Sequence, residues 1–228
     1  MDNYDIENYG SAEFLSTSRN NYGEFRRVNA MIPFSFLDKT AKDFDWKIYG
    51  HTDTKSASDI SNAFILNFDK FLSEGKGLYI YSSAKGSGKT LLSCCLLNEI
   101  VARHDINAKF INSLDYLELT KKSYTSQADK EEINAIEKSR MLIFDDLGVE
   151  LSKEWTSTVL YRLINYRYNN KLITIITSNL PIEGLKVDDR IKDRLNSMCI
   201  PLHIPEVSVR TAESHARNEE FLKDVLSG

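Results

Sequence analysis

Residues 79–90 read Tyr79-Ile80-Tyr81-Ser82-Ser83-Ala84-Lys85-Gly86-Ser87-Gly88-Lys89-Thr90. An apolar, strand-like stretch enters a turn with two glycines, and Gly-Lys-Thr then opens an apolar, helix-like stretch. In a loop of this kind, consecutive backbone N–H groups face phosphate oxygens at the positive end of a helix. The alternative interpretation is a surface turn of Gly, Ser and Lys. The pattern predicts a phosphate-binding loop, and with it a nucleoside triphosphate and Mg²⁺ as ligands.

The loop departs from the common pattern G-x-x-x-x-G-K-[ST] at its first position, where Ser83 replaces glycine. Gly86 and Gly88 keep backbone freedom nearest the phosphates, and a serine can adopt the turn if its φ stays negative. Lys89 would reach the β- and γ-phosphates, and the Thr90 hydroxyl would bind Mg²⁺. We expect the nucleotide to be bound by Ser83, Ala84, Lys85, Gly86, Ser87, Gly88, Lys89, Thr90 and Leu91.

Length and composition indicate a soluble protein of one domain. The chain has 228 residues, of which 42% are hydrophobic and 27% charged. No apolar run approaches the roughly 20 residues that span a membrane, and the acidic N-terminus lacks the apolar core of a secretory signal. Three cysteines make no disulfide framework, and no Cys/His cluster has zinc-ligand spacing. We expect a cytoplasmic protein without membrane contact. Because the net charge is −4, any nucleic-acid contact must come from a local patch.

Strand-like and helix-like stretches alternate from Gly77 onward, which indicates βαβ units and a parallel sheet. The predicted strands are Gly77–Tyr81, Ala108–Ile111, Met141–Phe144, Leu172–Ile176 and Ile200–Ile204. Helices are predicted at Ser58–Glu74, Thr90–Arg103, after Ser113, and at Trp155–Tyr168 and Asp188–Leu195. The polar stretch Lys121–Lys138 interrupts the alternation, and it predicts an exposed loop that leads into a solvated helix. The fold class is therefore α/β.

Two acids follow the predicted strand Met141–Phe144. Asp145 would hold Mg²⁺ through a water, and Asp146 would orient or activate the water that attacks the γ-phosphate. The alternative is a turn in which an aspartate caps the next segment. Asn179 follows the predicted strand Leu172–Ile176, with Thr177 behind it, and its side chain could reach the same water.

Arg190 and Arg194 are four residues apart, so they lie on one face of a predicted helix. In an oligomeric ATPase, an arginine at this place can reach the nucleotide of the next subunit and neutralise charge in the transition state. Salt bridges with Asp189 and Asp193 within the same helix are the alternative.

The ordered motifs resemble those of the DnaC/DnaI helicase loaders and the related IstB transposition ATPases, both of the AAA+ class. The resemblance covers about residues 32–210. Its most specific parts are Asp-Asp-Leu-Gly at 145–148, Asn-Tyr-Arg-Tyr at 165–168 and Thr-Ser-Asn-Leu at 177–180.

This resemblance implies a P-loop NTPase with a parallel sheet of order 5-1-4-3-2, flanked by helices and without a full C-terminal lid. It implies that Lys89 and Thr90 are Walker A residues, that Asp145 and Asp146 are the Walker B pair, and that Asn179 is sensor 1. Arg194 best matches the arginine finger, with Arg190 second, and Arg210 matches a sensor 2 residue.

The resemblance also implies partners. Residues 1–31 would be a tail that docks on a helicase, although an ordinary disordered terminus is an equal alternative, and residues 32–228 would form the ATPase domain. The insertion at Lys121–Glu132 lies where initiator-type relatives contact single-stranded DNA, so Lys121, Lys122 and Tyr124 would supply charge and a stacking face. A solvated surface helix is the alternative there.

We therefore expect a loader that binds ATP·Mg²⁺ between subunits of a self-oligomer. It would deliver a hexameric replicative helicase to single-stranded DNA, and its ATP hydrolysis would release the partner. The alternatives are an IstB-like transposition helper, and a non-hydrolysing P-loop adaptor, which the serine at position 83 motivates.

Overall fold

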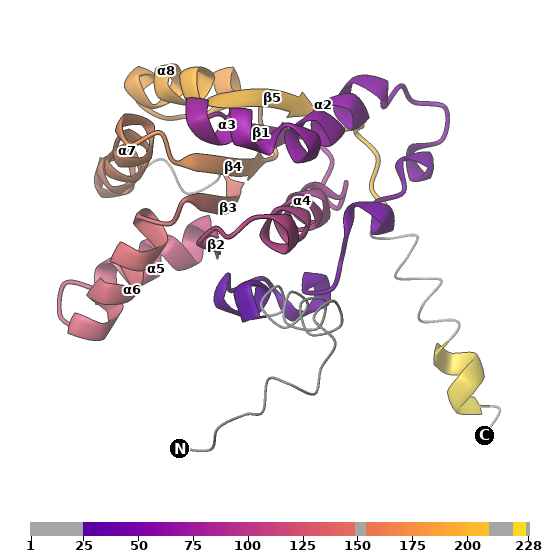
Figure 1. The fold of residues 1–228 in the computed structure, drawn as a ribbon, viewed down its shortest axis with the longest axis horizontal. Coiled ribbons are helices and arrows are strands. Elements are labelled where there is room, and N and C mark those ends of the chain that lie inside the picture. Colours follow the sequence, from indigo (N-terminus) through magenta and orange to yellow (C-terminus); the bar gives the residue numbers. More distant parts are fainter. Residues whose placement is uncertain (1–24, 149–153, 210–220, 227–228) are drawn as a thin grey trace, which may run out of the picture.

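A five-stranded, all-parallel sheet forms the centre of the molecule (Figure 1). The computed structural model describes residues 25–148, 154–209 and 221–226. The sheet has the order β2-β3-β4-β1-β5. Its strands are β1 (Gly77–Tyr81), β2 (Ala108–Asn112), β3 (Met141–Leu147), β4 (Ile173–Ser178) and β5 (Cys199–His203). Counted from the other edge this is 5-1-4-3-2, so the predicted α/β fold class and strand order are confirmed.

The strands alternate their side chains between two apolar layers, because successive residues of a strand point to opposite faces. In β3, Met141 and Ile143 join one buried cluster, whereas Leu142 and Phe144 join the other. Strands with helices on both faces are apolar at every position, which explains why the sequence shows uninterrupted apolar runs here.

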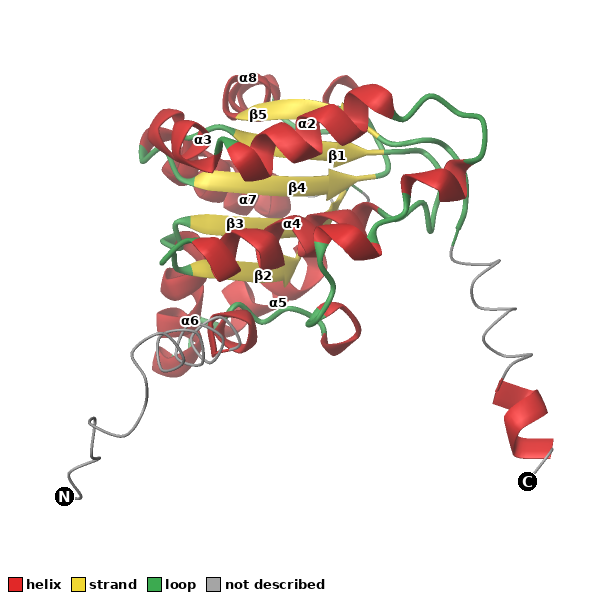
Figure 2. Ribbon diagram, turned by 45° about the vertical axis from the view of Figure 1, so that its right-hand side comes forward, coloured by secondary structure: helices red, strands yellow, loops and turns green. Residues whose placement is uncertain are grey.

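Helices cover both faces of the sheet, as Figure 2 shows. One layer contains α2 (Lys55–Leu66), α3 (Phe68–Glu74) and α4 (Lys89–Arg103). The other contains α5 (Ser113–Lys122), α6 (Gln127–Glu137), α7 (Glu154–Asn169) and α8 (Asp189–Met198). The described residues also include short 3₁₀ helices: η2 (Phe34–Phe36), η3 (Ala41–Asp43), η4 (Trp46–Tyr49) and η5 (Ile182–Gly184). Among the described helices, none is long and apolar enough to cross a bilayer.

The single helix predicted at Ser58–Glu74 is instead two helices, α2 and α3, with a break at Asn67. The Asn67 side chain donates to the Ala63 carbonyl at 3.1 Å, and its backbone has φ −115° and ψ 30°. Asparagine competes with the helix in this way because its amide can bond nearby backbone groups. The helical period continues across the break, which is why the sequence pattern did not reveal it.

The polar stretch Lys121–Lys138 folds as predicted into an exposed turn and a solvated helix. Helix α5 continues through Lys122, and α6 begins after Ser126, whose hydroxyl accepts from the backbone N–H of Asp129 at 3.3 Å. Only Ile133, Ile136 and Glu137 of α6 are buried.

The described end of the predicted tail contacts the domain. Arg26 donates to the carbonyls of Val101 and His104 at 3.2 and 3.1 Å, and Ala30 accepts from the backbone N–H of Phe110 at 2.7 Å. Ala30 is fully buried. Residues 26–30 are therefore anchored on α4 and β2, and any docking function of the segment 1–31 stays a prediction.

Candidate functional site

The carboxyl ends of β1, β3 and β4 open into one cleft of about 640 Å³. Its lining includes the loop residues Lys85, Gly86, Ser87, Gly88, Lys89, Thr90 and Leu91, together with Asp145, Asp146 and Asn179. Ligands of open α/β sheets bind at this edge because loops and helix N-termini meet there. The structure thus brings together residues of three motifs that are up to about 95 positions apart in the sequence.

The loop between β1 and α4 uses its glycines where the backbone needs them. Gly86 has φ 74° and Gly88 has φ 96°, the left-handed region that side chains rarely adopt. Ser83 is not among the described non-glycine residues with positive φ, so the serine keeps the ordinary conformation that we expected. Ser83 is exposed, and neither it nor Ala84 lines the cleft, whereas residues 85–91 do.

Lys89 is only 8% exposed, and its ammonium lies inside the loop. It donates to the carbonyls of Ser82 and Ala84 at 3.1 and 3.0 Å, and to the Ser87 hydroxyl at 3.1 Å. These contacts hold a positive charge at the start of α4. A positive charge beside a helix N-terminus favours anions, so this end of the cleft is suited to phosphates.

Asp145 is buried at the end of β3 between two hydroxyls. Thr90 donates to its two carboxylate oxygens at 3.0 and 3.2 Å, and Thr177 donates to Oδ1 at 2.6 Å. Burial raises the pKa of Asp145 above its ordinary value, while the hydrogen bonds from Thr177 and Thr90 lower it. A hydroxyl and a carboxylate are hard oxygen ligands, the kind that Mg²⁺ takes alongside phosphates and waters. Thr90 and Asp145 therefore fit a magnesium ion.

Asp146 is exposed to the cleft and has an unusual backbone, with φ 56°. The ladder between β3 and β4 shifts register between Phe144 and Leu147, so the chain bends there. The backbone of Asp146 is fixed on both sides, since its N–H donates to the Thr177 hydroxyl at 2.8 Å and its carbonyl accepts from Ser113 at 2.9 Å. Asn179 donates to its carboxylate at 3.2 Å. The structure thus holds a carboxylate and an amide side by side over the cleft.

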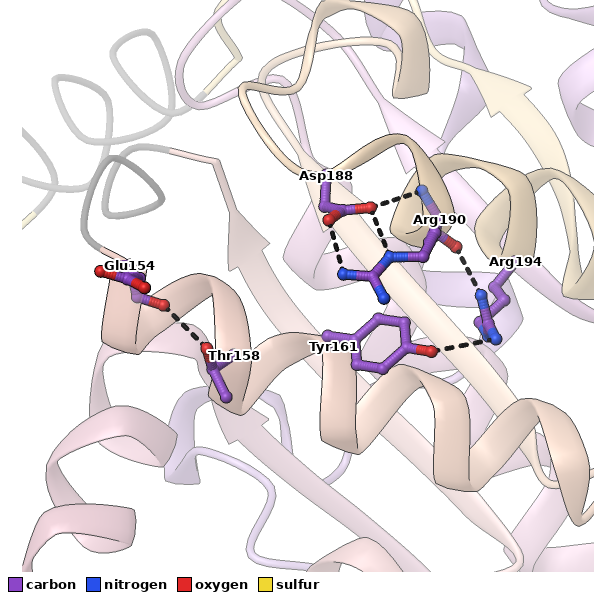
Figure 3. A network of polar contacts seen from close by, with 6 residues as sticks. All are labelled: Glu154, Thr158, Tyr161, Asp188, Arg190 and Arg194. Atoms are coloured by element: carbon purple, nitrogen blue, oxygen red, sulfur yellow. Dashed lines mark hydrogen bonds and ion pairs between the residues drawn. The ribbon is translucent and has the colours of Figure 1, made fainter.

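The two arginines of α8 lie away from the cleft, against α7, and Figure 3 shows the contacts around them. Arg194 donates to the Asn165 side chain at 2.9 Å, to the Arg190 carbonyl at 3.0 Å and to the Tyr161 hydroxyl at 3.2 Å. Its guanidinium also lies 4.9 Å from the Tyr161 ring. These contacts hold the half-buried Arg194 in one orientation.

Arg190 is more exposed and is paired with Asp188. Its Nε and Nη2 donate to the two oxygens of that carboxylate at 2.9 and 2.8 Å. The hydrogen bonds from Arg190 lower the pKa of Asp188 to about 2, so the carboxylate stays charged at neutral pH. The alternative, that these arginines form salt bridges, is thus confirmed for Arg190 only, and its partner is Asp188 instead of Asp189 or Asp193.

The remaining predicted residues lie elsewhere. Lys121 and Lys122 at the end of α5 and Tyr124 in the turn that follows are all exposed, and the Lys121 ammonium lies 5.1 Å from the centroid of the Trp155 ring. Arg210, the predicted sensor 2 residue, lies outside the described residues. Its neighbour Val209 lines the cleft and donates from its backbone N–H to the Gly86 carbonyl at 3.0 Å.

Sequence reasoning missed several residues that line the cleft or hold the groups that line it. Thr177 was noted only as a residue behind Asn179, yet it bonds to both acids. Phe36 and Asn112 line the cleft without any motif, and Tyr49 contacts the loop from 38 positions away. Only Thr177 carries a sequence signal, as a hydroxyl near the carboxyl end of a strand beside β3.

Known proteins are similar to this chain in sequence. A sequence profile of the family described as "IstB-like ATP binding protein" matches residues 15–217. The replicative helicase loader DnaI of Bacillus subtilis is 28% identical over 114 residues, which are 50% of this chain and 36% of that protein. The replicative helicase loader DnaC of Escherichia coli is 22% identical over 121 residues, 51% of this chain and 49% of that protein. The chain spans about a third to just over half of the length of the curated relatives it matches first.

Solved structures agree with this fold. A crystal structure of DnaI superposes with a TM-score of 0.64 at 25% identity, covering 76% of this chain and 94% of that one. The replication initiator DnaA bound to AMPPCP and single-stranded DNA has a TM-score of 0.61 at 21% identity, covering 76% of this chain and 50% of that one. Because the family profile spans most of the sequence, this chain belongs to the family of IstB-like ATP binding proteins, with the P-loop AAA+ fold that DnaC and DnaI share.

Proposed function

We propose that this protein is an ATP-dependent loader of a replicative helicase. One observation carries the proposal: the phosphate loop, Asp145, Asp146 and Asn179 meet in a single cleft, while Arg190 and Arg194 do not line it. No arginine is among the described residues that line the cleft, so the cleft is suited to receive one from a neighbouring subunit. The similarity to the replicative helicase loaders DnaI and DnaC supports helicase loading as the function of such a shared site.

The residues of the three motifs in the cleft have separate roles in this proposal. Lys89 and the backbone of residues 86–88 bind the phosphates of ATP, and Thr90 and Asp145 hold Mg²⁺. Bound Mg²⁺ would neutralise charge on the β- and γ-phosphates. Asp146 accepts a proton from the attacking water, and Asn179 orients that water beside the γ-phosphate.

Arg194 acts on the ATP of the adjacent subunit, so the active form is a self-oligomer. The contacts with Tyr161 and Asn165 keep its guanidinium oriented before the subunits meet, which lowers the entropic cost of placing it. Arg190 is the second candidate, and it would first have to leave Asp188. Hydrolysis then acts as a switch that releases the partner.

Two surfaces would contact the other components. The N-terminal segment 1–31 would hold a hexameric helicase, and Lys121, Lys122 and Tyr124 would contact single-stranded DNA through charge and stacking. We further propose that the protein acts in the cytoplasm, without membrane contact.

The test is a pull-down of the host's hexameric helicase with the full chain and with a variant that lacks residues 1–24. The truncation stops there because Arg26 and Ala30 bind the domain, so the ATPase core keeps its anchor. We expect ATP-dependent capture by the full chain and loss of capture by the truncated variant. If the truncated variant captures the helicase as well as the full chain does, the tail is not the helicase-binding segment. If neither protein captures the helicase, the helicase is not the partner.

A transposition helper of the IstB type is the second candidate, because the matching family is described as IstB-like. Such a protein would bind long duplex DNA in preference to single strands. Binding to both is measured at the same salt concentration, because phosphate contacts make each affinity depend on salt, and the preferred form of DNA distinguishes the candidates. A non-hydrolysing adaptor, the third candidate, is excluded if ATP turnover is measured and is lost in both Lys89→Ala and Asp146→Ala.

A further inference from the structure

Tyr49 contacts the phosphate loop but does not line the cleft. It lies at the end of η4, is 3% exposed, and donates from its hydroxyl to the Ser87 carbonyl at 2.5 Å. No motif marks this residue, and 38 positions separate it from its acceptor.

An aromatic cluster fixes the position of this hydroxyl. The rings of Phe44 and Trp46 pack edge-to-face with centroids 4.7 Å apart, and each centroid lies 6.3 Å from that of Tyr49. Gly88 lies directly against the cluster, because a Cβ built on it would be 3.1 Å from the Tyr49 hydroxyl and 3.2 Å from Phe44. The loop at Gly88 therefore packs directly against Tyr49 and Phe44.

This hydrogen bond determines where the next N–H points. The peptide unit is planar, and in its trans form the carbonyl of one residue and the N–H of the next point in opposite directions. The described residues contain no cis peptide bond. Since the Ser87 carbonyl faces Tyr49, the Gly88 N–H points away from Tyr49, and both residues of this peptide, Ser87 and Gly88, line the cleft.

The preceding peptide is fixed in the same way by a different part of the chain. The Val209 N–H donates to the Gly86 carbonyl at 3.0 Å, so the Ser87 N–H is turned from that bond toward the opposite side. Within the described part of the chain, neither Ser87 nor Gly88 uses its backbone N–H in a hydrogen bond. The carbonyls of these two peptides accept hydrogen bonds from Val209 and Tyr49. These bonds fix the directions of the two adjacent N–H groups, those of Ser87 and Gly88.

We propose that Tyr49 is a positioning residue for phosphate binding, which holds the Ser87–Gly88 peptide so that its N–H faces the β- and γ-phosphates. The inference rests on the proposed ATP site and deepens it, because it assigns a role to a residue that does not touch the ligand. Pre-orienting donors raises affinity by removing the cost of ordering them on binding.

The experiment measures binding of ATP and AMP to the full chain by calorimetry, for the wild type and for Tyr49→Phe. This substitution keeps the ring and its packing and removes only the hydroxyl. We expect ATP affinity to fall about three- to tenfold, the loss that corresponds to one hydrogen bond. AMP, which lacks the β- and γ-phosphates, should bind as it does to the wild type, so the preference for ATP over AMP narrows.

Tyr116→Phe is the matched control. Tyr116 is equally buried, 1% exposed, and its hydroxyl donates at 2.8 Å to Glu137 in the other apolar layer. Tyr116→Phe also removes a buried phenolic hydroxyl, but from a site that does not line the cleft. ATP and AMP should therefore bind this variant as they bind the wild type.

The outcomes separate this inference from the proposed site. Unchanged ATP affinity in Tyr49→Phe, or an equal loss for ATP and AMP, overturns the positioning role provided that Lys89→Ala abolishes ATP binding. Unchanged ATP binding in Lys89→Ala would instead overturn the ATP site itself, and the role of Tyr49 with it.

Discussion

The Thr177 hydroxyl donates to Oδ1 of Asp145 at 2.6 Å, and so it ties the ends of two neighbouring strands at the candidate metal site. The same oxygen accepts from the backbone N–H of Asp146 at 2.8 Å. Thr177 is 1% exposed and does not line the cleft. One buried hydroxyl thus orients the carboxylate of the first acid and the backbone of the second.

Thr177→Val keeps the shape of the side chain and removes both hydrogen bonds. We expect ATP turnover to fall about 10- to 100-fold, the usual effect of losing a group that orients a metal ligand. The Mg²⁺ concentration for half-maximal rate should rise, because Asp145 loses a bond that favours its charged form. Steady-state ATPase assays across a magnesium titration check this. Thr177→Ser, which keeps the hydroxyl, should behave like the wild type, and a Thr177→Val enzyme with full turnover would contradict the role.

Asp146→Asn should separate ATP binding from ATP hydrolysis. Asp146 has φ 56°, a conformation that asparagine tolerates better than alanine, so the backbone and the bond to Thr177 should persist. The amide cannot accept a proton from water, and we expect turnover to fall about 100-fold or more. Affinity for ATP, measured by calorimetry, should change less than threefold or so, because Asp145 and the loop are untouched. Loss of ATP binding in Asp146→Asn would show that this residue serves the ground state instead.

Mixed oligomers test whether Arg194 acts across a subunit boundary. Arg194→Ala alone should lose about a thousandfold or more in turnover while it still binds ATP, as expected for an arginine that acts in the transition state. Lys89→Ala alone should fail to bind ATP but still present an intact Arg194. When the two variants are mixed, some junctions pair an intact cleft with an intact arginine, and activity should return.

The control is a mixture of Arg194→Ala with the double variant Lys89→Ala/Arg194→Ala, which has no intact junction and should stay inactive. Asn165→Ala should weaken turnover only in the neighbour's site, because the Asn165 side chain holds Arg194 and not the cleft of its own subunit. If the first mixture is as inactive as its components, Arg194 does not act in trans.

The sequence predicted much of this fold for identifiable reasons. The limits of β1, Gly77 and Tyr81, follow from an apolar run that ends at the phosphate loop, and the structure has the same bounds. Strands buried on both faces and helices with one apolar face leave strong periodic signals. The break at Asn67 left none, because α3 continues the apolar pattern of α2 after a local change in the backbone.

The residues of the candidate site fall into two groups, those that the sequence revealed and those that it did not. Residues that would contact phosphate or metal, such as Lys89 and Asp145, follow a spacing that the ligand imposes, so motifs revealed them. Residues that orient those groups have no fixed spacing, since any segment that reaches the right place can supply a hydroxyl. Tyr49 and Thr177 are of this kind, and only the tertiary structure brings them to the loop and to Asp145.

Arg167 should be among the most costly residues to replace, although it lies at the opposite edge of the sheet from the cleft. It is fully buried and donates to the Thr174 hydroxyl at 2.8 Å and to three carbonyls, those of Glu137, Ser139 and Ile173, at 3.0, 3.0 and 2.6 Å. Burial lowers the pKa of this guanidinium to about 9, so it stays charged at neutral pH. Arg167 thus ties the segments that lead into β3 and β4.

Arg167→Ala leaves these buried acceptors without a donor, and we expect the free energy of unfolding to fall by about 3 kcal/mol or more. Arg167→Lys should recover part of this loss, because an ammonium has donors but not the planar fork that reaches all four acceptors. Urea denaturation checks the prediction, with a lower midpoint at an unchanged slope. Arg162→Ala is the control, since its side chain is 70% exposed and lies 4.0 Å from Glu137, and it should change stability by about 0.5 kcal/mol at most. ATP affinity of folded Arg167→Ala should match the wild type, and a parallel loss of ATP binding would mean that this edge of the sheet also shapes the cleft.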